Sequence, residues 1–123
     1  MRLDFDLVRL ILLEIEKSPA NRDPDTVKVP GFDEDTVLEH LAIMAEKGLI
    51  DAEVIEAGSG DQRVVAAFVK RMTWEGHEFL DNARNDEVWS TTKKVVKEKG
   101  GSVSFDIFTA ILTQVALNLF RLG

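Results

Sequence analysis

The fold is decided by residues 48–80, which read GLIDAEVIEAGSGDQRVVAAFVKRMTWEGHEFL. Within residues 50–57, Ile50, Ala52 and Val54 alternate with Asp51 and Glu53. Residues 64–69 are continuously apolar, and a polar stretch containing two glycines separates the two segments. This pattern predicts two strands joined as an antiparallel hairpin. Thr73 is a suitable N-cap for a helix that continues to about Arg84, in which Trp74, Phe79 and Leu80 are predicted to be buried.

Two helices are predicted before this hairpin. Residues 4–17 carry an apolar stripe at helical spacing, with Asp4 or Asp6 as the N-cap and Pro19 as the stop. Residues 18–31 contain all three prolines and are predicted to be mainly irregular, with only 26–29 able to pair as a short strand. Asp33 then caps a helix that ends near Lys47, and Gly48 provides its left-handed C-terminal cap.

Two further helices are predicted after residue 84. The first runs from about residue 86 to residue 99 and is broken by Gly100 and Gly101. Ser102 or Ser104 caps the second. Its apolar residues follow an alternating spacing of three and four, and they are Phe105, Phe108, Leu112, Val115 and Leu119.

This order of elements is typical of a winged-helix-like domain, of a mainly α (α+β) class, with the two-stranded β-hairpin as the wing and extra C-terminal helices. With 123 residues, of which 45% are apolar and 30% charged, the chain is predicted to form a single domain with one core. Residues 1–84 form the winged-helix-like core of this prediction, and residues 85–123 form a C-terminal helical extension.

Several short segments resemble an uncharacterised bacterial and phage family that is catalogued only as a domain of unknown function. The resemblance implies a winged-helix-like fold, no established activity and no functional residues that can be transferred. The segments are Asp4–Arg9, Ile11–Glu16, Gly31–Phe32, His40–Leu41, Gly48–Ile50, Met72–Asp81, Val88–Trp89 and Lys99–Ser102.

The charge distribution argues against DNA recognition by the expected helix. The net charge is −7, and the helix before the wing, residues 34–47, carries four acidic side chains against Lys47 alone. Such a helix is repelled by phosphates and offers no Arg, Asn or Gln to base edges. At the wing tip Arg63 is offset by Asp61, and the helix that normally precedes the reading helix is replaced by the proline-rich stretch.

A basic patch lies in the C-terminal third, where five bases face two acids. Its residues Lys93, Lys94 and Lys97, together with Arg63, are the candidate nucleic-acid contacts. The favoured interpretation of these lysines is a solvated helix face that also complements the helix dipole. A phosphate-binding patch in this place gives weak and nonspecific binding.

No catalytic, metal or cofactor site is predicted, and the chain is not expected to be an enzyme. The sequence has no cysteine, which excludes thiolate chemistry and favours a reducing cytoplasm. His77 and Asp81 lie four residues apart but lack further ligands, and His40 is expected to be a hydrogen-bonded boundary residue. Neither a signal peptide nor a membrane span is expected.

The last helix carries a wider apolar arc than a small domain usually buries. We therefore expect a homodimer, with Phe105, Phe108, Leu112, Val115 and Leu119 at its interface. The alternative is that this arc packs on the chain's own core.

Two functions remain open on the sequence alone. The residue chemistry favours a protein-interaction or dimerisation module with an unidentified protein partner, which has kept the scaffold and does not read DNA through its acidic helix. Analogy with the fold favours a DNA-binding transcription regulator, bacterial or phage-encoded, that uses the basic C-terminal patch.

Overall fold

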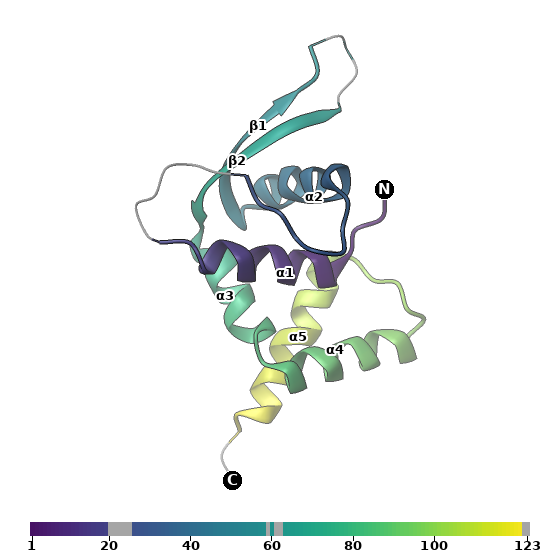
Figure 1. Ribbon diagram of the computed structural model, residues 1–123. Coiled ribbons are helices and arrows are strands. Elements are labelled where there is room, and N and C mark those ends of the chain that lie inside the picture. Colours follow the sequence, from purple (N-terminus) through teal and green to yellow (C-terminus); the bar gives the residue numbers. More distant parts are fainter. Residues whose placement is uncertain (20–25, 59, 61–62, 122–123) are drawn as a thin grey trace. The chain divides into compact units, whose positions relative to one another are not determined.

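The computed structural model describes residues 1–19, 26–58, 60 and 63–121. The described chain is mainly helical with one antiparallel hairpin, as predicted (Figure 1). It divides into two compact units, Met1–His77 and Glu78–Gly123, and the division falls inside a helix that the sequence assigns to the core. The elements are α1 (Phe5–Glu16), α2 (Glu34–Lys47), β1 (Ile50–Glu56), β2 (Val64–Met72), α3 (Trp74–Ala83), α4 (Asp86–Glu98) and α5 (Phe105–Leu119).

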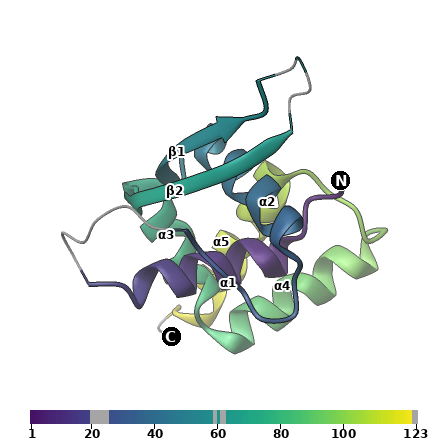
Figure 2. The same cartoon turned by 45° about the horizontal axis from the view of Figure 1, so that its top comes forward.

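The hairpin of the first unit packs along α2 (Figure 2). Its register pairs Ile50 with Met72 and Val54 with Ala67, and β2 extends three residues beyond the predicted end at residue 69. The inner face of β2 is apolar, since Val64, Ala67, Val69 and Met72 are buried. Residues 26–29 form no strand, so the described sheet contains β1 and β2.

Helix α1 buries the stripe that its spacing predicts, namely Leu7, Val8, Ile11, Leu12 and Ile15. Of the two possible caps, Asp4 is the one used, and its side chain accepts a hydrogen bond from the N–H of Leu7 at 3.2 Å. The N–H of Asp4 in turn donates to Nε2 of His40 on α2 at 2.9 Å. The N-terminus of α1 is thereby tied to α2.

His40 is fully buried rather than at a boundary, although it is hydrogen-bonded as predicted. Its Nδ1 lies 2.9 Å from the carbonyl oxygen of Thr36. Because Nε2 accepts a hydrogen bond and a carbonyl can only accept one, the ring proton belongs on Nδ1. Both ring nitrogens are therefore occupied in structural bonds, and His40 is not available to a ligand.

The chain turns from α2 into β1 and from β2 into α3 at one tightly bonded junction. Gly48 ends α2 with a φ of 88°, as predicted, and the hydroxyl of Thr73 donates to its carbonyl oxygen. The N–H of Thr73 donates to the carbonyl oxygen of Leu49 at 3.0 Å. The Thr73 hydroxyl also caps α3 by accepting from the N–H of Gly76 at 3.1 Å.

The prediction that Trp74 is buried is wrong, because this side chain is 75% exposed. The buried positions of α3 are 76, 79, 80 and 83, which form one helical stripe. Residue 74 lies about half a turn from residue 76 and so faces the opposite side. The apolar character of Trp74 suggested burial. However, Gly76 lies close to the backbone of Leu49, and this contact fixes the rotation of the helix about its axis.

The core of the second unit contains a cluster of aromatic side chains from α3, α4 and α5. Phe79 stacks on Phe105 with 5.4 Å between ring centroids, and Trp89 and Phe108 form a T-shaped pair with 5.2 Å between centroids. Asn85 caps α4 and Ser104, not Ser102, caps α5. Gly100 and Gly101 link the two helices with φ values of 112° and 82°, in agreement with the predicted break.

Candidate functional site

The solvent side of α2 is acidic, and this is the surface that a winged-helix protein would present to DNA. Helix α2 buries Val37, Leu38, Leu41 and Met44 together with His40. Glu34, Asp35 and Glu46 are exposed, whereas the one base of the helix, Lys47, lies in its last turn. Three of the four acidic side chains of this helix are therefore exposed to solvent.

Hydrogen bonds from Thr36 stabilise the negative charge of Asp33, the N-cap of α2. The side chain of Asp33 accepts a hydrogen bond from the N–H of Thr36 at 2.8 Å. This bond, with a further bond from the Thr36 side chain, holds the pKa of Asp33 below its ordinary value of 3.8. Asp33 is therefore ionised throughout the neutral and mildly acidic range.

Asp33→Asn is expected to lower stability most at neutral pH. The lowered pKa means that ionised Asp33 stabilises the folded state above pH 3.8, and that this contribution disappears as the pH falls through the folded-state pKa. The difference between wild type and Asp33→Asn should thus shrink in urea titrations carried out from pH 6 towards pH 3. The exposed neighbour Asp35 caps no N–H, so Asp35→Asn is the matched control. An unchanged difference at pH 3 would exclude this role.

The acidic side chains of β1, Asp51, Glu53 and Glu56, balance the bases of the wing among the described residues. Arg63 is exposed at the base of the tip, where its carbonyl oxygen accepts from the N–H of Ala57 at 2.8 Å. Arg71 lies 3.9 Å from the carboxylate of Asp51 on the paired strand. The predicted offset of Arg63 by Asp61 falls outside the described residues.

The outer face of the wing is partly apolar, which the sequence reasoning missed. Ile55 is 41% exposed and Phe68 is 37% exposed. Ile55 lies two residues after Glu53 and four after Asp51, so the two-residue period already put it on the same face as two acids. This two-residue period was the sequence signal that could have predicted the exposure of Ile55.

The structure brings Lys93, Lys94 and Lys97 together on the exposed side of α4. The opposite side of the helix is buried through Val88, Trp89, Thr92 and Val96. All three lysines are solvent-exposed. They belong to the second unit, whereas the fourth predicted contact, Arg63, belongs to the first.

The predicted dimer stripe on α5 is mostly internal. Phe108 is 1% exposed and Leu112 is fully buried, so neither can lie at an interface with a second copy. Phe105 and Val115 are half-buried, and Phe105 stacks on Phe79. The alternating spacing reflects packing within the chain, and only Leu119 of the five predicted residues is exposed.

The exposed apolar surface of α5 lies elsewhere. Leu117 is 59% exposed and Phe120, directly after the helix, is 69% exposed. Leu119, which is 39% exposed, also lies at this end of the chain, and we call these three exposed apolar residues the α5 end cluster. Ile107, also exposed, lies near the other end of the helix. The sequence indicated the excess of apolar side chains but not which of them face solvent.

No group of three or more His, Cys, Asp or Glu side chains within reach of one metal ion occurs among the described residues. His77 and Asp81 are both exposed on α3. Within the described ranges, no helix has the length and apolar character needed to cross a bilayer.

Comparisons with known proteins give a family but no activity. Residues 2–102 match the family model described as "Hypothetical protein (DUF2513)". An uncharacterised protein of Haemophilus influenzae (strain ATCC 51907 / DSM 11121 / KW20 / Rd) is 38% identical over 109 residues, which cover 86% of this chain and 87% of that protein. No solved structure matches the chain. The family match spans α1 to α4 and ends before α5.

Proposed function

The chain belongs to the DUF2513 family, and we propose that it is a protein-interaction module that forms a homodimer and does not read DNA through α2. The acidic solvent side of α2 is the observation that carries this proposal. The proposal includes a winged-helix-like fold, which is supported by the order of helix, helix, hairpin and helix in α1 to α3. It also includes a cytoplasmic location, supported by the lack of cysteine, and no catalysis.

Electrostatics weighs against insertion of α2 into the major groove. Each carboxylate that approaches the phosphate backbone is repelled, and groove binding gains its affinity by releasing counterions from neutralised phosphates. Base-specific contact requires donors such as the guanidinium of Arg or the amide of Asn and Gln. The exposed turns of α2 provide Glu34, Asp35 and Glu46 instead.

The α5 end cluster supports a second copy of this chain as the partner. Large apolar side chains grouped on a protein surface commonly mark an interface, and a two-fold axis allows one patch to cover its own copy. Leu117, Leu119 and Phe120 are few compared with the 20–30 residues per side of a standard interface. We therefore expect a dimer with a dissociation constant in the micromolar range.

Light scattering at increasing protein concentration tests the dimer. We expect the mass of two chains at tens of micromolar for the wild type and the mass of one chain for Phe120→Glu, because a carboxylate cannot be buried unpaired at the interface. Ile107→Glu makes the same change at another exposed position of α5 and is the matched control. A wild-type monomer at tens of micromolar, or equal weakening by both variants, would remove the α5 end cluster as the interface.

A DNA-binding regulator is the second candidate, and the exposed row of lysines on α4 favours it. Fluorescence polarisation with duplex DNA at low salt separates the two functions. Absence of binding at micromolar protein supports the interaction module. If DNA binds, changing Lys93, Lys94 and Lys97 to Gln should weaken binding and flatten its salt dependence. The same change at Lys17, Lys47 and Lys70 in the first unit, removing equal charge, is the control.

A further inference from the structure

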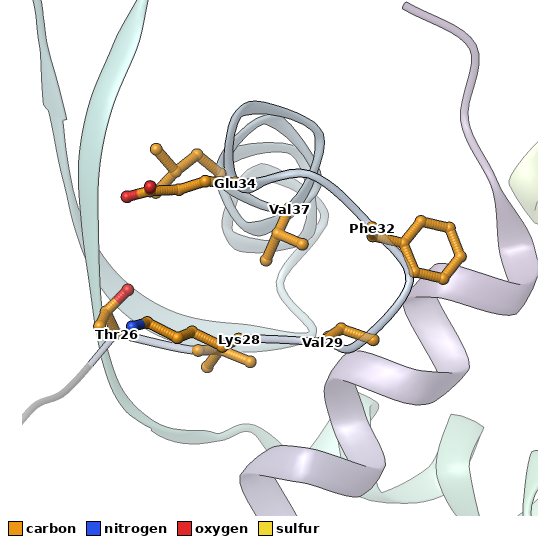
Figure 3. A pocket seen from close by; sticks show the side chains of 8 residues that line it. Thr26, Lys28, Val29, Phe32, Glu34 and Val37 are labelled. Carbon is orange, nitrogen blue, oxygen red and sulfur yellow. The ribbon is translucent and has the colours of Figure 1, made fainter.

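A small pocket lies in the first unit between the irregular segment 26–29 and the first two turns of α2 (Figure 3). Its volume is about 260 Å³. Pockets for drug-sized ligands span roughly 300–1,000 Å³, so this one fits a smaller metabolite. Its lining residues belong to the first unit, whereas the α5 end cluster belongs to the second.

The pocket is apolar inside and charged at its rim. Val29, Val37 and Leu38 line it and are each less than 10% exposed, so they form its floor. Thr26, Lys28 and Glu34 line it and are exposed. In Figure 3 the hydroxyl of Thr26, the ammonium of Lys28 and the carboxylate of Glu34 extend towards the same end of the pocket, while Val37 points into it.

A ligand that fits this arrangement needs both charges and a short apolar body. A ligand with only a carboxylate would bind Lys28 but would be repelled by the carboxylate of Glu34. A ligand with only an amine would bind Glu34 but would be repelled by the ammonium of Lys28. A zwitterion satisfies both groups at once, with its carboxylate on Lys28 and its ammonium on Glu34. The pocket volume of about 260 Å³ has room for one aliphatic side chain.

We propose that this pocket binds a free α-amino acid with an aliphatic side chain. Lys28 and Glu34 recognise the α-carboxylate and the α-ammonium, and Val29, Val37 and Leu38 receive the side chain. The rim is open to water, which weakens each charge contact. The dissociation constant is therefore on the order of 1 mM, as expected for a cellular metabolite bound by few contacts.

Calorimetry and thermal shift with L-leucine as the probe test this assignment on the full chain. We expect saturable binding and a rise in melting temperature that grows with leucine concentration. Isoamylamine lacks the carboxylate, 4-methylpentanoate lacks the ammonium and glycine lacks the side chain, so each should bind at least about 10-fold more weakly. N-acetyl-leucinamide retains the side chain without either charge. Its binding as tightly as leucine would show that the pocket accepts a peptide side chain and would overturn the proposal.

Two charge-neutralising variants locate the site. Lys28→Gln and Glu34→Gln should each weaken leucine binding about 10-fold while leaving the melting temperature without ligand nearly unchanged, since both side chains are exposed. Lys47→Gln and Glu46→Gln make the same changes at the other end of α2 and should bind leucine as the wild type does. No saturable binding of leucine at about 10 mM, or equal loss in the control variants, would refute the proposal.

Discussion

Gly76→Ala is expected to lower the free energy of unfolding by about 3 kcal/mol and the melting temperature by about 10 °C or more. A Cβ atom at residue 76 would overlap the carbonyl oxygen of Leu49 and would lie 2.6 Å from Cγ of Met72. The Leu49 oxygen cannot withdraw freely, because it accepts the hydrogen bond from the N–H of Thr73. Alanine gains about 1 kcal/mol in helix propensity, which is smaller than the cost of the clash.

Urea unfolding followed by circular dichroism measures this loss. Gly58→Ala is the matched control, because a Cβ atom there meets nothing within 4 Å and the residue is exposed in the loop after β1. We expect that control to stay within about 0.5 kcal/mol of wild type. Equal stability of the two variants would show that α3 can shift away from Leu49, and the rotation that exposes Trp74 would then need another cause.

The ends of the helices were predictable because their signals are local. A capping side chain bonds an N–H only three residues away, as Asp33 and Ser104 do, and a left-handed glycine such as Gly48 acts within one turn. The stripe of α1 and the two-strand hairpin were predictable for the same reason, since each follows one period along the chain. These local signals define the elements without placing them in space.

The sites were harder to predict because they depend on contacts between distant residues. The spacing of Phe108 and Leu112 predicts an apolar stripe but is the same whether a helix packs on its own chain or on a second copy. The burial of both side chains and the contact of Phe108 with Trp89 show that the stripe is internal. The pocket depends on where segment 26–29 runs beside α2, and no periodic pattern in that proline-rich stretch indicates its path.

Trp74 and Trp89 show that burial, too, depends on contacts between distant residues and not on residue type. Both are large aromatic residues near the start of a helix, and hydrophobicity alone predicts burial for both. Trp74 is 75% exposed and Trp89 is 4% exposed. The helix rotation that the neighbouring contacts impose decides which of them enters a core.

Trp89→Ala is expected to be the most destabilising single change in the second unit, at about 3–5 kcal/mol. Trp89 packs edge-on against Phe79, with 6.2 Å between ring centroids, and against Phe108 at 5.2 Å. Its removal leaves a cavity that the surrounding rings cannot fill without moving off their packing positions. Urea unfolding followed by far-ultraviolet circular dichroism measures the loss.

Trp74→Ala is the control for this prediction, because it removes the same side chain from a position that is mostly in water. We expect a loss within about 0.5 kcal/mol. Each variant also leaves one tryptophan, so the emission of Trp74→Ala reports the buried Trp89 and should be blue-shifted, whereas that of Trp89→Ala reports the exposed Trp74 and should be red-shifted. Similar stability losses or similar emission maxima in the two variants would contradict the burial of Trp89. They would also contradict the internal packing of Phe108 against Trp89, which is the reason for excluding Phe108 from a dimer interface.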